Sequence, residues 1–227
     1  MTSTTLLVIG VLAVAVVAVL VSCRGKSQER SDKEIFEEVL NDPRVNSREV
    51  GEREGIEFFQ VMKDGKTGFR DLDGNVVIEP KYKSAEMFSE GLSAVQVTEK
   101  GKYGFINTKG EMVIAPTFEY AGSFSNGLAA FRVNDLYGFI DWTGKEAISP
   151  RYAWVDQFSE GFCVVRDALG KHAFIDLLGK QMTEFKFQSA RGFEGGKAKV
   201  CMDNKWGAID MNGDVVVDFT HEYADFD

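Results

Sequence analysis

The side chains of this sequence that could carry out chemistry are mainly carboxylates. The 227 residues include 35 Asp and Glu but only two His and three Cys. Glu90 and Glu160 each stand in a Phe-Ser-Glu-Gly phrase, and paired carboxylates would point to an exported hydrolase acting on envelope glycans. Because both residues occupy the same slot of a recurring phrase, we interpret them as turn residues. We therefore predict that the chain is not an enzyme, with the hydrolase as the alternative.

The remaining reactive residues predict no metal or cofactor site. Asp71 and Asp210 each begin a phrase like a calcium loop, but its glycine stands at position 4, whereas an EF-hand needs glycine at position 6. His172 and His221 stand where equivalent segments have Tyr or Trp, so we interpret them as packing rings. No Walker loop, Cys-x-x-Cys or His-Glu-x-x-His motif occurs. We expect no catalytic residue and no cofactor.

The composition favours a folded, acidic domain. Hydrophobic residues make up 44% of the chain and aromatic residues 12%, which is too apolar for a disordered chain. The formal net charge is −9, and the isoelectric point is near 4.9. Because such a chain repels phosphate backbones, we exclude nucleic acid as a partner.

Residues 1–22 form a separate segment, which we expect to be an apolar helix. Leu6 to Ser22 carry no charge, as in a signal peptide or a short membrane anchor. The phrase that ends at Cys23 resembles the bacterial lipobox, in which this cysteine becomes the lipidated N-terminus. The Lys and Arg residues after the apolar run favour instead an uncleaved single-pass anchor with cytoplasmic repeats. We expect membrane attachment, as an outward-facing bacterial lipoprotein or, alternatively, by that anchor.

A polar tether follows in residues 23–53. Ser31 and Glu34 fit a capping box, and apolar residues at helical spacing continue until Pro43 ends the run. This pattern predicts a short amphipathic helix over 32–41.

From residue 54 to 227 the sequence repeats itself. A phrase such as Gly104-Phe-Ile-Asn107 recurs five times at spacings of 34 to 36 residues, and a glycine always stands six residues after its first position. This period is typical of arrays in which each copy packs on its neighbours. The five copies cover residues 55–90, 91–126, 127–160, 161–195 and 196–227.

Each copy predicts a three-stranded antiparallel β-meander. Asp or Asn followed three residues later by Gly, as in Asp141-Trp-Thr-Gly144, predicts a hairpin turn between two strands. A further strand opens each copy, and Pro-x-Tyr and Phe-Ser-Glu-Gly turns join one copy to the next. We therefore predict an all-β fold of five tandem meanders in an open curved array, with a closed propeller-like ring as the alternative.

Differences in length between copies fall in the loop that joins the first and second strands. Loops that vary on a constant scaffold are where a repeat protein can place its binding specificity; tolerated solvated turns are the other reading. The candidate binding residues in these loops are Lys63, Asp64, Lys66, Glu99, Lys100, Asn134, Asp135, Asp167, Asp203 and Asn204.

The recurring phrases resemble the bacterial WG repeat, also called the KWG repeat. The resemblance is carried by Lys205-Trp-Gly-Ala-Ile-Asp210, by Lys102-Tyr-Gly-Phe-Ile-Asn107 and by the Pro-x-Tyr and Phe-Ser-Glu-Gly turns. The fourth copy departs from it, because Ala173 replaces the leading glycine. The resemblance implies an all-β repeat module, often on exported or membrane-attached bacterial proteins, with no established catalytic residues.

These observations together predict a membrane-tethered, non-catalytic repeat module. We expect it to bind a protein or a cell-envelope polymer through its surface loops.

Overall fold

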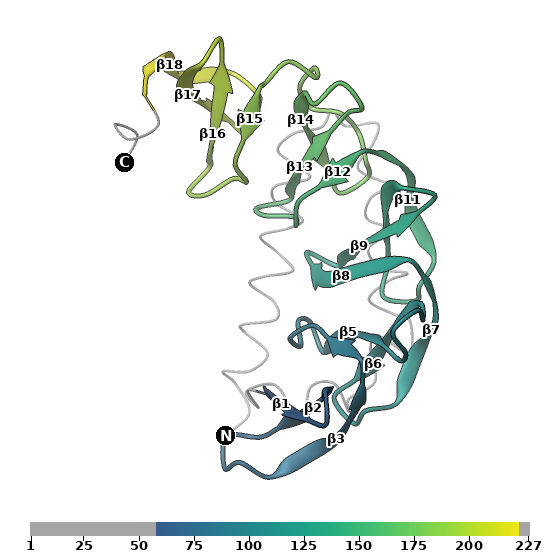
Figure 1. Ribbon diagram of the computed structural model, residues 1–227. Coiled ribbons are helices and arrows are strands. Elements are labelled where there is room, and N and C mark those ends of the chain that lie inside the picture. Colours follow the sequence, from purple (N-terminus) through teal and green to yellow (C-terminus); the bar gives the residue numbers. More distant parts are fainter. Residues whose placement is uncertain (1–57, 223–227) are drawn as a thin grey trace, which may run out of the picture. The chain divides into compact units, whose positions relative to one another are not determined.

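The protein is described here by a computed structural model that covers residues 58–222 (Figure 1). These residues form strands, turns and loops without any helix, so the predicted all-β class is confirmed. The apolar segment 1–22, Cys23 and the expected helix 32–41 lie outside the described residues. Within the described part of the chain, no helix has the length and apolar character needed to cross a membrane.

The strands form five antiparallel sheets that follow one another in chain order (Figure 1). The first contains β1 (Phe59–Lys63), β2 (Lys66–Arg70) and β3 (Val76–Tyr82). The second contains β4 (Ser84–Ala85), β5 (Leu92–Gln96), β6 (Tyr103–Asn107) and β7 (Met112–Phe118). The third contains β8 (Tyr120–Ser125), β9 (Leu128–Val133), β10 (Leu136–Ile140) and β11 (Glu146–Tyr152). The fourth contains β12 (Trp154–Val155), β13 (Phe162–Arg166) and β14 (His172–Asp176), and the fifth contains β15 (Ser189–Ala190), β16 (Lys197–Met202), β17 (Lys205–Asp210) and β18 (Val215–His221).

Three of these sheets have four strands, one more than the predicted three-stranded unit. The extra strand comes from residues just after the Pro-x-Tyr phrase, which were expected to be a connecting turn. They stay extended and pair with the first long strand of the next copy, as Ser84 does with Gln96. Each such sheet therefore contains strands from two successive copies.

The array is open in the described part of the chain. The first sheet contains only β1 to β3 and the last only β15 to β18, so no sheet joins the two ends. The expected open arrangement is thus supported, and the alternative of a closed ring is not.

The predicted hairpin turns are present and follow one pattern. In the third copy, Oδ1 of Asp141 accepts hydrogen bonds from the backbone N–H of Thr143 at 2.9 Å and of Lys145 at 3.1 Å. Gly144 then has a φ of 80°, which suits a residue without Cβ. The same side-chain bonding is made by Asn107, Asp176 and Asp210. These side chains determine the turn locally.

The turn glycine also packs against the preceding copy. A Cβ on Gly144 would lie 2.8 Å from Cγ2 of Ile114, which is buried one copy earlier. The same contact joins Gly179 to Ile148. The glycine is therefore required both by its backbone conformation and by the close approach of neighbouring copies.

The core lies between successive copies and is rich in Phe. Phe124 and Phe158, from two Phe-Ser phrases, each pack on a ring of their own copy, Phe105 at 5.0 Å and Phe139 at 4.9 Å. The buried clusters that hold these rings also include residues of the following copy, Phe131 and Ile140 in one and Val165 and Ile175 in the other. The serine hydroxyl that follows each ring donates to a backbone carbonyl one copy later, from Ser125 to Phe158 at 2.7 Å. Ser89 and Ser159 make the equivalent bonds. Each copy is thus held to the next by apolar packing and by a repeated hydrogen bond.

The fourth copy lacks the third strand of the meander. In the third copy a Cβ on Gly138 would lie 2.4 Å from the carbonyl oxygen of Ile148 on β11, so the two strands approach too closely for any side chain. Ala173 occupies this position in the fourth copy. The residues after β14 form no regular strand beside it and make only isolated bridges to β14. The hydroxyl of Thr183 accepts the backbone N–H of Phe174 at 3.2 Å. A single methyl group therefore coincides with the loss of a regular strand pair.

Candidate functional site

The loops that vary in length join β1 to β2, β5 to β6, β9 to β10, β13 to β14 and β16 to β17. Three of them are two-residue hairpins in which both residues have positive φ: Asp64–Gly65, Asn134–Asp135 and Asp203–Asn204. Asn, Asp and Gly are the residues that tolerate this type I′ geometry. The position of the variable loops agrees with the prediction.

The candidate loop residues differ in how much they contact the rest of the chain. All are exposed except Asp167, which is half-buried. Glu99 forms an ion pair with Lys83 at 2.9 Å, and Asn204 exchanges hydrogen bonds with the side chain of Gln188. Their role in binding stays a prediction.

A row of aromatic and arginine side chains lies directly beside these loops. It arises from the strand register, because residues opposite each other on neighbouring strands project from the same face. In the third sheet Tyr120 pairs with Arg132, which pairs with Tyr137 at the loop between β9 and β10. In the fourth sheet Trp154 pairs with Arg166, which pairs with His172. The cross-strand row is defined here as Tyr103, Tyr120, Arg132, Tyr137, Trp154, Arg166 and His172.

The first part of the cross-strand row is continuous across two sheets. The ring centroid of Tyr120 lies 6.0 Å from that of Tyr103 on β6 and 5.9 Å from that of Tyr137. The guanidinium of Arg132 lies 5.9 Å from the Tyr137 ring centroid, and the hydroxyls of Tyr103 and Ser84 are 3.3 Å apart. Aromatic and cation–π contacts of this kind hold the side chains in a defined arrangement.

The second part repeats this arrangement with different rings. Trp154 meets the imidazole of His172 edge-on at a centroid separation of 6.2 Å. The guanidinium of Arg166 lies 6.0 Å from the Trp154 ring. The interpretation of His172 as a packing ring is consistent with this contact.

The charge of the cross-strand row is positive at neutral pH. Burial lowers the pKa of His172, so the imidazole is neutral at pH 7. Burial, and then the nearby carboxylate of Glu86, raise the pKa of Tyr120, so its phenol also stays neutral. Arg132 and Arg166 carry the charge, and the buried Nε of Arg132 has no hydrogen-bond partner among the described residues. Neutral rings combined with arginine are characteristic of protein-binding surfaces.

Sequence reasoning did not identify Tyr120, Trp154 and the two arginines as candidate binding residues. Tyr120 and Trp154 each stand two residues after the last residue of a Pro-x-Tyr-type phrase, so they share a position in the repeat. That periodic placement was a usable signal. It was missed because these residues were assigned to a connecting turn, where no cross-strand neighbours were expected.

The two glutamates considered for hydrolysis have structural partners. The carboxylate of Glu160 accepts the backbone N–H groups of Gly195 and Gly196, both at 2.8 Å and both in the turn before β16 of the next sheet. Glu90 accepts the N–H of Gly127 at 3.0 Å and the indole N–H of Trp142 at 3.2 Å. Both glutamates lie in turns with positive φ, as interpreted from the sequence, and each also joins two successive sheets.

The carboxylates of the calcium-like phrases are likewise engaged in turns. Oδ1 of Asp210 accepts the N–H groups of Asn212 and Asp214, and these hydrogen bonds lower the pKa of Asp210. Within residues 58–222, no group of three or more His, Cys, Asp or Glu side chains is arranged to hold a metal ion.

Several solved structures match the chain with low sequence identity and TM-scores below 0.5. Hsv2 from Kluyveromyces lactis matches with 10% identity and a TM-score of 0.49, over 70% of this chain and 58% of that one. The computationally designed protein Ika8 matches with 14% identity and a TM-score of 0.43, over 71% of this chain and 60% of that one. Virginiamycin B lyase from Staphylococcus aureus matches with 19% identity and a TM-score of 0.40, over 71% and 69%. The chain thus spans less than two thirds of the first two structures.

The family is established by a different comparison. No curated protein sequence gives a significant match to this chain. The family model described as the WG containing repeat, in contrast, matches residues 68–100, 103–137, 137–167 and 173–206. These matches cover more than half of the sequence and coincide with the strands and turns described above. The chain therefore belongs to the family of proteins built from WG-containing repeats.

Proposed function

We propose that the protein is a membrane-tethered, non-catalytic module that binds a protein or a cell-envelope polymer through the cross-strand row and the adjacent variable loops. The observation that carries this proposal is the continuity of the row, in which Tyr120 contacts rings on both its own sheet and the preceding one. A surface of this kind offers an extended partner several equivalent contacts in succession. Apolar residues 6–22 and Cys23 supply the attachment to the membrane.

The absence of catalysis is part of the proposal. It is supported by the partners of Glu90 and Glu160, whose carboxylates accept N–H groups of the next sheet and so serve the stacking of the array.

The binding surface is tested with the full chain in detergent micelles, using isolated cell-wall glycan and an envelope protein fraction as separate probes. Replacing Tyr120 and Tyr137 by Ala should weaken binding to one probe by at least about tenfold, since aromatic residues often dominate interface energetics. The matched control replaces Met112 and Val113, which are exposed apolar residues on β7 outside the row. Equal binding by both double variants would refute the proposed surface.

Membrane attachment is tested by the intact mass of the protein extracted from its native membrane. A mass without residues 1–22 that includes acyl chains on Cys23 would establish the lipoprotein form. An unprocessed mass would establish the uncleaved anchor, and a protein recovered entirely in the soluble fraction would refute the tether.

A further inference from the structure

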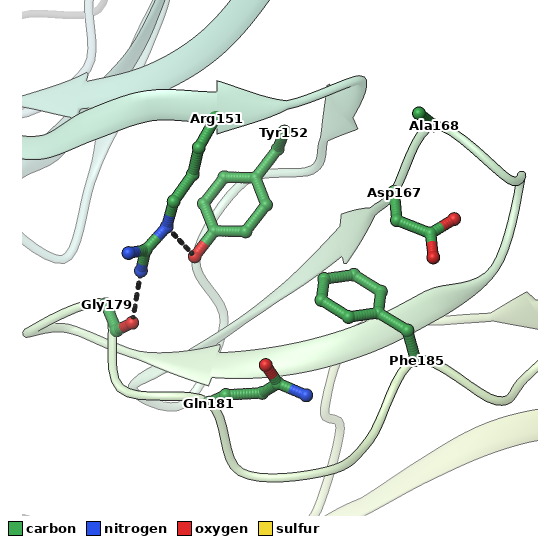
Figure 2. Close-up of a pocket in the computed structure, with 7 residues that line it drawn as sticks. All are labelled: Arg151, Tyr152, Asp167, Ala168, Gly179, Gln181 and Phe185. Carbon is green, nitrogen blue, oxygen red and sulfur yellow. Dashed lines mark hydrogen bonds between the residues drawn. The ribbon is translucent and has the colours of Figure 1, made fainter.

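A pocket of about 460 Å³ lies where the fourth copy departs from the regular repeat. Arg151 and Tyr152, at the end of β11, form one side, and Asp167, Gln181 and Phe185 form the other (Figure 2). Gln181 and Phe185 belong to the irregular segment that replaces a third strand after β14. The volume lies in the usual range for small-molecule sites, roughly 300–1,000 Å³.

One end of the pocket holds a positioned cation. The Nε of Arg151 donates to the hydroxyl of Tyr152 at 2.9 Å, and its Nη2 donates to the carbonyl oxygen of Gly179 at 2.8 Å. A guanidinium carries five N–H donors, so these two bonds fix its position while leaving donors for a ligand. Arginine held in this way suits the recognition of a carboxylate.

The other end of the pocket holds an anion. Asp167 begins the loop between β13 and β14, and its Oδ1 accepts the N–H of Leu169 at 2.9 Å and of Lys171 at 2.8 Å. Figure 2 shows this carboxylate at the opposite side of the pocket from Arg151, with the rings of Tyr152 and Phe185 between them. Asp167 is also the only half-buried residue among the predicted loop candidates.

We propose that this pocket binds a small zwitterionic peptide, whose ammonium and carboxylate groups lie at opposite ends of the molecule. The carboxylate of the ligand pairs with Arg151, its ammonium group pairs with Asp167, and its apolar part lies against Phe185. This orientation satisfies both charges, which lie at opposite ends of the pocket, and a ligand with one charge leaves the other side unpaired. The site shares Asp167 with a variable loop but contains no residue of the cross-strand row, so it can be tested apart from the function proposed for that row.

The test compares three probes by calorimetry on the full chain in micelles. The dipeptide glycylphenylalanine carries both charges at its two ends, its N-acetyl derivative lacks the ammonium group, and its C-terminal amide lacks the carboxylate. We expect glycylphenylalanine to bind about tenfold more tightly than either of the others, because each lost charge removes a charge-assisted hydrogen bond.

Two variants assign the charges to their partners. Asp167→Asn should weaken glycylphenylalanine binding about tenfold and leave binding of the N-acetyl derivative unchanged. Asparagine is compatible with this turn, since Asn107 makes the same Oδ1 bonds in the second copy. Arg151→Gln should likewise weaken binding of glycylphenylalanine and leave that of its C-terminal amide unchanged.

The control variant is Asp210→Asn, which makes the same substitution in an equivalent turn outside the pocket. It should leave the affinity for glycylphenylalanine unchanged. The proposal is overturned if glycylphenylalanine shows no binding at millimolar concentration, if all three probes bind equally, or if Asp167→Asn has no more effect than Asp210→Asn.

Discussion

The third and fourth copies have the same hairpin chemistry but different strand pairing. Asp141 and Asp176 close equivalent turns with equivalent hydrogen bonds. In the third copy, however, β10 pairs with a seven-residue strand, β11, whereas β14 has only isolated bridges to the segment after it. The comparison shows that a locally determined turn does not guarantee the strand beyond it.

Two substitutions coincide with this difference. Ala173 takes the place of Gly138, where there is no room for a Cβ beside the neighbouring strand. Thr183 takes the place of Ile148, and its hydroxyl accepts a backbone N–H of β14. The irregular segment after β14 forms one wall of the pocket. The pocket therefore lies where the fourth copy departs from the regular repeat.

The largest expected effect comes from making the third copy resemble the fourth. Gly138→Ala places a Cβ 2.4 Å from the carbonyl oxygen of Ile148 and 2.7 Å from the backbone N of Pro150, so β11 must move. We expect a loss of about 2–4 kcal/mol in the free energy of unfolding, as for other strained or overpacked sites. Chemical denaturation measures the loss, and amide hydrogen exchange should show faster exchange over β11. Unchanged protection of β11 would contradict the explanation given for the fourth copy.

A smaller effect is expected at the glycine that ends the hairpin turn, which is present in both the third and the fourth copies. Gly144→Ala combines a positive φ with a Cβ only 2.8 Å from Ile114, and should destabilise the protein by about 2–3 kcal/mol. The matched control is Gly170→Ala, where φ is 81° but no atom lies within 4 Å. The control should cost about 1–2 kcal/mol, from backbone strain alone. Equal losses in thermal unfolding would show that packing between copies does not add to the requirement for glycine.

The serine bonds between copies are expected to contribute less. Ser125→Ala removes the hydrogen bond to the Phe158 carbonyl that joins the second and third copies. The expected loss is about 1 kcal/mol in the free energy of unfolding by urea. Thr117→Ala is a suitable control, because this exposed hydroxyl bonds only within its own strand, at 3.4 Å. If the two variants lose the same stability, the serine bond has no special role in stacking.

The smallest effect concerns the pH dependence of Glu90. Burial raises the pKa of this carboxyl above its ordinary value, so the native state favours the protonated form. Its contribution to stability is therefore complete below pH about 4, near the unfolded pKa, and decreases as the pH rises through the higher folded pKa. Glu90→Gln should remove this decrease, and the gain over the natural protein should grow between pH 4 and 7 while staying small because solvent screens the site. A difference in melting temperature that does not change with pH would contradict this assignment.

Much of the architecture could be predicted because its signals are short-range. The Asp or Asn that opens each turn bonds to N–H groups two and four residues later, as Asp141 does, so the turn is specified within five residues. The strands that flank it have the expected β-branched and aromatic residues. The variable loops followed from comparing the lengths of successive copies.

The candidate surface was harder to predict because it depends on register. Tyr120 and Arg132 lie opposite each other only because β8 pairs with β9, and the strand β8 was not expected. Without that pairing, no periodic pattern shows which side chains share a face.

The sequence by itself determined the repeat period, the all-β class and the hairpin turns, since each rests on residues close together in the chain. Only the tertiary structure decided that Glu90 and Glu160 join neighbouring sheets, that the rings of the cross-strand row meet, and that a pocket opens beside Arg151. Those features bring together residues that are often about one copy apart. Contacts at this separation depend on how the copies pack, and local propensity carries no information about that packing.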